Sequence, residues 1–349
     1  MKFKLETITS VNIGSGDIFS PYSDYIYDNG YVYYIDHDLL IKELWKKENS
    51  EELIDQFVQV VNNQAKGNLQ ERFNLKNFLV EANLNYRKFV LQKIAVDAVI
   101  REEIQLNIKT GIQPYIPGSS LKGAIRTSLI CYLYSGEEKG LKNKKNYIGE
   151  DILGKYSDDV LKHLMISDTQ PFQEDALGIE RFNRFNLENK KVTIPVVKEV
   201  IKEGSITHFR IKSKAGSSDL KGKFSFLQEG NEEELLSIIN KYAKRNITIE
   251  LDQLDKYSGE EINKLKDFYK RLLHDVKNVD EKKAAYLRIG SGKTYYNNTI
   301  AQCLSKGFLK QIIDKNFKNS NIENFPTTRT VIFKGSFIYV PGWIKITRE

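Results

Sequence analysis

The chain has 349 residues, and its 53 Lys and Arg against 46 Asp and Glu give a formal net charge of +7 and a pI of about 9.0. A hydrophobic content of 40%, with 19 Tyr, 18 Phe and 2 Trp, excludes a disordered chain, and no apolar run is long enough for a transmembrane helix. The length suits two domains with cores of their own, and the moderate positive charge suits a nucleic-acid partner.

The first third of the chain begins as strands and then turns helical. Residues 3–8 alternate as a strand, and the glycine loop Ile-Gly-Ser-Gly at 13–16 interrupts it. Residues 25–35 predict a hairpin, because Asn29-Gly30 is a strong two-residue turn signal. From about 38 to 100 the apolar spacing is helical, which predicts an insertion, and residues 104–108 alternate as a strand again.

The rest of the chain mixes isolated helices with strands. A helix is expected from Pro117 onward, followed by a charged, glycine-punctuated loop at 137–145. Helices are expected to start near residues 231 and 258. Alternation predicts strands at 164–168, 192–201, 205–213, 331–339 and 343–346.

The stretch from Tyr115 to Thr127 is the most informative one. Pro117-Gly118 predicts a bend that opens into a helix whose first amides Ser119 or Ser120 caps. Lys122 and Arg126 are four residues apart and share a face. A helix N-terminus with small residues and two cations favours a phosphate, and a nucleic-acid backbone is its expected source. The alternative is a capped core helix with two solvated cations.

Cations and rings alternate between residues 180 and 191. Arg181, Phe182, Arg184 and Phe185 form a mixture that suits stacking on single-stranded bases. The alternative is a surface loop whose aromatic side chains tuck beneath it. Sequence alone leaves both interpretations open.

A short repeat suggests a duplicated unit. Ile-Gly-Ser-Gly occurs at 13–16 and at 289–292, and an apolar-Pro-Gly step follows each copy, at 116–118 and at 340–342. We therefore predict an α+β protein of two ferredoxin-like, RRM-like halves with antiparallel sheets. The predicted domains are residues 1–250, with the helical insertion at about 38–100, and residues 251–349.

Few residues have the spacing that metal binding or catalysis needs. Cys131 and Cys303 lie in apolar helical runs without a metal-ligand partner, which predicts buried thiols in a reducing compartment, the cytoplasm. The four histidines (His37, His163, His208 and His274) form no metal-binding pair, and neither a Walker loop nor a nucleophile elbow is present. We expect no metal, no cofactor and no catalytic residue.

Acidic residues gather after the first glycine loop, at Asp17, Asp24, Asp28, Asp36 and Asp38. Such a group can coordinate Mg²⁺ or position a ribose hydroxyl. Acids at these places more often end strands and cap turns, which is the interpretation we favour.

The stretch IPGSSLKGAIRTSL, together with Ile-Gly-Ser-Gly, resembles the RAMP superfamily of CRISPR-associated proteins. The ordered set of motifs is similar to the type III-A, Csm-complex subunit that caps the 3′ end of the guide RNA. It comprises the first glycine loop with Asp24-Tyr25-Ile26, the helix after Pro117, Ile166-Ser167-Asp168, the second glycine loop and Pro341-Gly342-Trp343. Some sixty helical residues before the Pro-Gly step depart from the backbone subunits of these complexes.

The resemblance implies a non-enzymatic RNA-binding subunit of a type III-A interference complex. It would hold the 3′ part of the guide RNA (crRNA), end the filament of backbone subunits and be required for guide 3′-end maturation. Its partners would be guide RNA, target RNA, the backbone and small subunits and a recruited host nuclease, with no membrane. The implied RNA contacts are Gly14, Ser15, Gly16, Ser119, Ser120, Lys122, Arg126, Gly290, Ser291, Gly292 and Lys293.

Two enzymatic alternatives remain open within the same superfamily. A guide-processing endoribonuclease would need a histidine near the active face, and His37 is the early candidate. A target-cutting subunit would use an acid shortly after the first glycine loop, where Asp24 lies.

Overall fold

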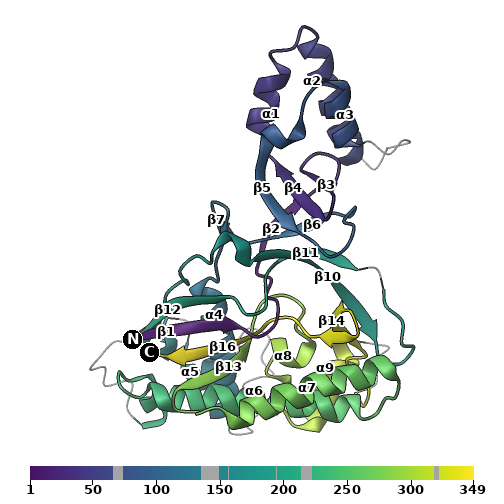
Figure 1. The fold of residues 1–349 in the computed structure, drawn as a ribbon. Coiled ribbons are helices and arrows are strands. Elements are labelled where there is room, and N and C mark those ends of the chain that lie inside the picture. The colour runs from purple at the N-terminus through teal and green to yellow at the C-terminus, as the bar shows by residue number, and fades with distance from the viewer. Residues whose placement is uncertain (66–73, 135–148, 156, 194, 214–221, 318–321) are drawn as a thin grey trace.

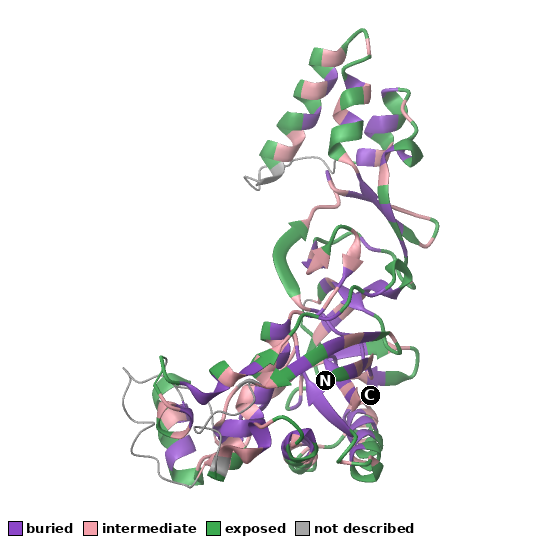
Figure 2. Ribbon diagram, turned by 90° about the vertical axis from the view of Figure 1, so that its left-hand side faces the viewer, coloured by how far each residue is buried: buried purple, intermediate pink, exposed green. Residues whose placement is uncertain are grey.

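The computed structural model describes residues 1–65, 74–134, 149–155, 157–193, 195–213, 222–317 and 322–349. Two sheets and the helices packed on them form a body, from which a lobe built around residues 25–95 projects (Figure 1). Buried residues concentrate along the strands of the body and at the base of the lobe (Figure 2). The predicted loop at 137–145 lies outside the described residues.

The first sheet of the body contains both ends of the chain. Within the described residues its five strands run in the order β13-β16-β1-β12-β9 and pair antiparallel. Apolar side chains alternate on β1 (Lys2–Thr7), so that Phe3 and Leu5 are fully buried against α4 (Gly118–Leu133) and α6 (Glu232–Leu254). The other strands are β9 (Leu164–Ile166), β12 (Ile206–Ser213), β13 (Ala284–Arg288) and β16 (Trp343–Arg348).

The second sheet packs against α7 (Glu260–Asn278), whose apolar stripe is buried in a second core. In the described part of the chain its strand order is β15-β14-β10-β11-β6-β2, and β11 pairs with β6 in parallel. The strands are β2 (Gly14–Phe19), β6 (Ile104–Asn107), β10 (Leu177–Asn186), β11 (Val196–Ile201), β14 (Thr328–Lys334) and β15 (Phe337–Tyr339). Strand β2 therefore forms one edge of this sheet.

Short elements complete the body. They are β7 (Lys109–Thr110), β8 (Gln113–Pro114), α5 (Glu150–Leu153), α8 (Tyr295–Asn298), α9 (Lys306–Asn316) and the 3₁₀ turns η3 (Val160–His163), η4 (Glu174–Ala176), η6 (Gly222–Leu227) and η7 (Ala301–Cys303).

The lobe combines the predicted hairpin with the predicted insertion. Strands β3 (Tyr25–Asp28) and β4 (Tyr31–Ile35) meet at the expected turn, where Asn29 and Gly30 have φ values of 48° and 78°. The insertion contains α1 (His37–Leu44), α2 (Ser50–Ala65), α3 (Leu75–Glu81) and η1 (Tyr86–Phe89). The last part of the insertion was predicted to be helical but is a strand. This strand, β5 (Val90–Ala95), pairs with β4 and buries alternate side chains.

The α+β prediction is confirmed, and the described strands pair antiparallel as predicted except for the parallel pair β11 and β6. The predicted boundary near residue 250 falls inside α6, and β1 lies between β12 and β16. Segments from the two predicted halves therefore share a sheet, and the division into two domains stays a prediction. No helix among the described residues is long and apolar enough to cross a membrane.

One prediction about individual side chains is wrong, and one open question is decided against base stacking. Cys131 of α4 and Cys303 of η7 form a disulfide with a Cα–Cα distance of 5.6 Å, although 172 residues separate them. Phe182 and Phe185 are not available for stacking on bases, because strand β10 buries both rings in the body. Neither outcome follows from local spacing, since each depends on segments that meet after folding.

Candidate nucleic-acid interface

Helix α4 begins at Gly118 as predicted, but neither Ser119 nor Ser120 caps it. The N-cap residue is Pro117, and the Asp168 carboxylate accepts the Gly118 N–H at 2.7 Å. A Cβ on Gly118 would lie closer than 3.0 Å to the backbone of Ile166, so glycine lets the helix start rest on the end of β9. One amide donor of this helix start is thus already used.

The two cations of α4 have different surroundings. Arg126 forms an ion pair with Asp159 at 3.3 Å, and their side chains are only 19% and 12% exposed. Arg126 therefore ties α4 to the segment that carries η3. Lys122 lies one turn closer to the helix start and is half-buried, and Ser119 is exposed beside it. Of the two predicted phosphate contacts, Arg126 is the one whose charge a carboxylate already engages.

The first glycine loop lies on the exposed edge strand β2. Gly14 to Ile18 are exposed, and a Cβ built on Gly14 or Gly16 would meet no described atom within 4 Å. Gly16 has a φ of +99°, which favours glycine, and the Ser15 hydroxyl accepts the Asp17 N–H at 3.1 Å. A phosphate backbone can approach this strand closely.

A buried polar network holds the first loop from below. The Asn107 side chain accepts the Ile13 N–H at 2.7 Å, and the Asn107 N–H donates to the Glu199 carboxylate at 2.8 Å. Glu199 is fully buried and pairs with Lys109 at 2.8 Å. Burial, followed by the nearby Glu199 charge, raises the pKa of Tyr34 well above its ordinary value. The network fixes the position at which β2 begins.

The second glycine loop packs directly against the residue that precedes the first. The Ser291 N–H donates to the Asn12 carbonyl at 2.9 Å, and the Ser291 hydroxyl donates to the Asn12 side chain at 2.7 Å. Gly290 has a φ of +72°, and a Cβ there would lie closer than 3.0 Å to the Asn12 carbonyl. The two copies of the repeat, far apart in sequence, thus meet at Asn12.

A buried arginine also contacts the backbone of the second loop. Buried Arg288 donates to the Gly292 carbonyl at 2.9 Å and to the Pro341 carbonyl at 3.1 Å. Burial, and then the Arg288 charge, lowers the pKa of Lys293. Ser291, Gly292 and Lys293 therefore lie in a packed loop, in contrast to the exposed first loop.

The two residues proposed for the enzymatic alternatives lie together, Asp24 in the turn after β2 and His37 at the start of α1. Asp24 accepts the Ser20 N–H at 2.6 Å and lies 3.4 Å from His37 Nε2. His37 Nε2 is 2.8 Å from the Ser23 carbonyl. Both side chains thus support a turn. Over the residues that the structure describes, no three His, Cys, Asp or Glu side chains are placed to hold a metal ion.

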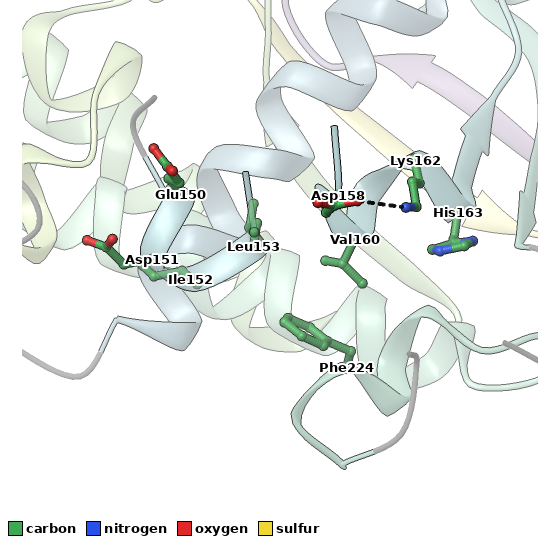
Figure 3. A pocket seen from close by; sticks show the side chains of 10 residues that line it. Glu150, Asp151, Ile152, Leu153, Asp158, Val160, Lys162, His163 and Phe224 are labelled. Carbon is green, nitrogen blue, oxygen red and sulfur yellow. Dashed lines mark ion pairs between the residues drawn. The ribbon is translucent and has the colours of Figure 1, made fainter. Parts of the chain in front are cut away.

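A cavity of about 500 Å³ is lined by α5, by residues at and around η3 and by Phe224 of η6 (Figure 3). Glu150, Asp151 and Asp158 line it, and Lys162 forms an ion pair with Asp158 at 3.9 Å. Three carboxylates against one lysine would repel a phosphate. This cavity is therefore not an additional phosphate site beside Lys122 and Arg126 of α4.

Sequence reasoning missed the residues that hold the loops in place. Asn12, Asp168 and Glu199 each accept or donate hydrogen bonds that position a glycine loop or the start of α4. Two of them adjoin quoted motifs: Asn12 precedes the first glycine loop, and Asp168 ends the Ile-Ser-Asp triplet. Glu199 had no signal beyond being a charged residue inside an apolar strand.

These features, glycine loops set on antiparallel sheets beside a helix that follows a Pro-Gly step, define a family. The chain belongs to the RAMP superfamily, whose family model matches residues 4–295. The predicted membership is confirmed.

The relatives are more specific. The chain is 27% identical to the CRISPR system Cms protein Csm5 of Methanocaldococcus jannaschii, covering 99% of this chain and 88% of that protein. It is 26% identical to the protein of the same name from Streptococcus thermophilus, covering 60% of this chain and 63% of that protein.

Solved structures share the fold. A chain of the cryo-EM structure of a Csm-crRNA-target RNA ternary complex of a type III-A CRISPR-Cas system is similar with a TM-score of 0.72 and 19% identity, covering 99% of this chain and 100% of that one. The crystal structure of T. onnurineus Csm5 gives a TM-score of 0.63 and 17% identity, covering 98% and 99%.

Proposed function

We propose that this protein is a non-catalytic RNA-binding subunit of a type III-A CRISPR interference complex. It binds the 3′ part of the guide RNA, ends the filament of backbone subunits and is required for maturation of the guide 3′ end. The observation that carries the proposal is the exposed glycine loop of β2, held from below by the buried Glu199 network, in a chain similar to proteins named Csm5. Its partners are guide RNA, target RNA and the other Csm-complex subunits, with a host nuclease recruited for trimming.

The RNA backbone is gripped at two places. Gly14, Ser15 and Gly16 present accessible backbone on β2, and Ser119, Ser120 and Lys122 present polar groups at the start of α4. The remaining proposed contacts (Arg126, Gly290, Ser291, Gly292 and Lys293) are more enclosed and contribute chiefly by shaping these two places. Such a grip acts on phosphates and is independent of base sequence.

Absence of catalysis is supported by the bonds that Asp24 and His37 already make. Each holds the turn between β2 and β3, and a general acid or base needs a side chain directed at the substrate. Their separation of 3.4 Å is the one observation that favours the alternative, an endoribonuclease that uses Asp24. Loss of RNA cutting by purified components with Asp24→Ala would establish that alternative.

Termination of the filament is assigned to the lobe. Backbone subunits that add head to tail need two complementary surfaces, and a terminal subunit must lack one of them. The lobe projects from the body at the side where β2 and β3 are connected (Figure 1). It is therefore placed to block the next subunit and to leave the RNA beyond the last grip open to a nuclease.

Sequencing the guides bound to purified complexes tests this role. In cells without the protein, we expect complexes that still assemble but carry guides of precursor length. Replacement of residues 38–88 by a Gly-Ser linker keeps β5, and it should broaden the length distribution while RNA binding persists. Mature 3′ ends in the deletion strain would show that the protein does not control guide length.

A further inference from the structure

A second cavity, of about 680 Å³, lies between the lobe and the body. It is lined by the turn after β2, by β3, by the start of α3 and by the residues before β6. Its volume falls in the range of about 300–1,000 Å³ that small-molecule sites occupy. The lining is aromatic, with Tyr22, Tyr25 and Tyr27 on one side.

The charges around this cavity favour an anionic ligand. Glu102 accepts hydrogen bonds from Arg181 at 2.9 Å, and Asp28 accepts one from Lys76 at 2.8 Å, so both nearby carboxylates are neutralised. The hydrogen bond from Lys76, followed by that from Tyr86, lowers the pKa of Asp28. Arg101 lines the cavity as an exposed residue and adds a positive charge.

The cavity continues the surface of the first glycine loop. Strand β2 is exposed from Gly14 to Ile18 and leads within a few residues to Pro21 and Tyr22 at the cavity wall. A single-stranded RNA held at the glycine loop can therefore run along β2 and reach the cavity without crossing the body. Rings beside a cation are the combination that binds unpaired bases in single-stranded nucleic acids.

We propose that this cavity binds one unpaired nucleobase of the guide RNA, stacked on Tyr22, with its phosphate at Arg101. The inference rests on the proposed function and adds a base-binding site to the phosphate grip. Because stacking uses the face of the base, the site tolerates any of the four bases. It would fix the path of the RNA where it leaves the glycine loop for the lobe.

The test uses the full-length protein and a single-stranded RNA with 2-aminopurine at successive positions. One position should change its fluorescence on binding, and the change should disappear with Tyr22→Ala and persist with Tyr22→Phe. Affinity for that RNA should fall roughly 5- to 150-fold with Tyr22→Ala, the range of one stacked base. Tyr31→Ala is the matched control, because Tyr31 of β4 is an exposed tyrosine outside the lining of the cavity, and its loss should leave affinity unchanged.

An RNA with an abasic site at that position separates contact from structure. If the base occupies the cavity, Tyr22→Ala should cost no further affinity on the abasic RNA. An equal loss on both RNAs, or no fluorescence change at any position, overturns the base site while the phosphate grip stands. Failure of the wild-type protein to bind RNA in a salt-dependent manner overturns the proposed function itself.

Discussion

Gly290→Ala should destabilise the protein far more than the same change at the equivalent glycine of the first loop. Gly290 has a φ of +72°, and a left-handed backbone costs a non-glycine residue about 1–2 kcal/mol. The added Cβ also meets the Asn12 carbonyl closer than 3.0 Å, and overpacking against a group that cannot move away costs about 1–3 kcal/mol. Together these terms lower the free energy of unfolding by about 2–5 kcal/mol, a large part of a typical 5–15 kcal/mol.

Gly14→Ala is the matched control, because its Cβ would meet no described atom within 4 Å. Its free energy of unfolding should stay within about 0.5 kcal/mol of wild type. RNA affinity should instead decrease, since the methyl group enters the space that a phosphate would use. Gly290→Ala should therefore lower the free energy of unfolding, whereas Gly14→Ala should lower the affinity for RNA.

Urea unfolding followed by tryptophan fluorescence measures the difference. Trp343 is 1% exposed and reports loss of the body, whereas Trp45 is 62% exposed and changes little. A urea midpoint for Gly290→Ala equal to that of Gly14→Ala would refute the packing of the second loop on Asn12.

Three further predictions concern Lys122, the pair Asp24 and His37, and the disulfide. Lys122→Gln should weaken RNA binding for any base sequence and reduce the salt slope by about one unit; an unchanged slope would mean that Lys122 contacts no phosphate. Asp24→Ala and His37→Ala should leave target cutting by the assembled complex unaltered, as measured with labelled target RNA, since both side chains serve the turn after β2. The Cys131–Cys303 disulfide closes a loop of 172 residues, so its reduction should lower the free energy of unfolding by up to about 5 kcal/mol; identical urea midpoints with and without reductant would contradict this.

Local signals predicted a large part of the fold. The hairpin at Asn29-Gly30 and the helix start at Gly118 formed where predicted, because each depends on backbone preferences of two or three adjacent residues. The strand β5 was missed, since its pairing with β4 overrides a helical pattern that is weak at that point. The helix cap was also missed, because Asp168 is 50 residues away from Gly118.

For the candidate site, the sequence by itself determined which residues are candidates, and the tertiary structure decided which of them are accessible. The repeat identified both glycine loops, but their chemistry is identical and gives no measure of burial. Only the meeting of Ser291 with Asn12, 279 residues away, makes the second loop a packed support and leaves the first exposed. Such contacts depend on how the sheets are assembled. The spacing of residues along the sequence does not say which distant segments meet in the folded protein.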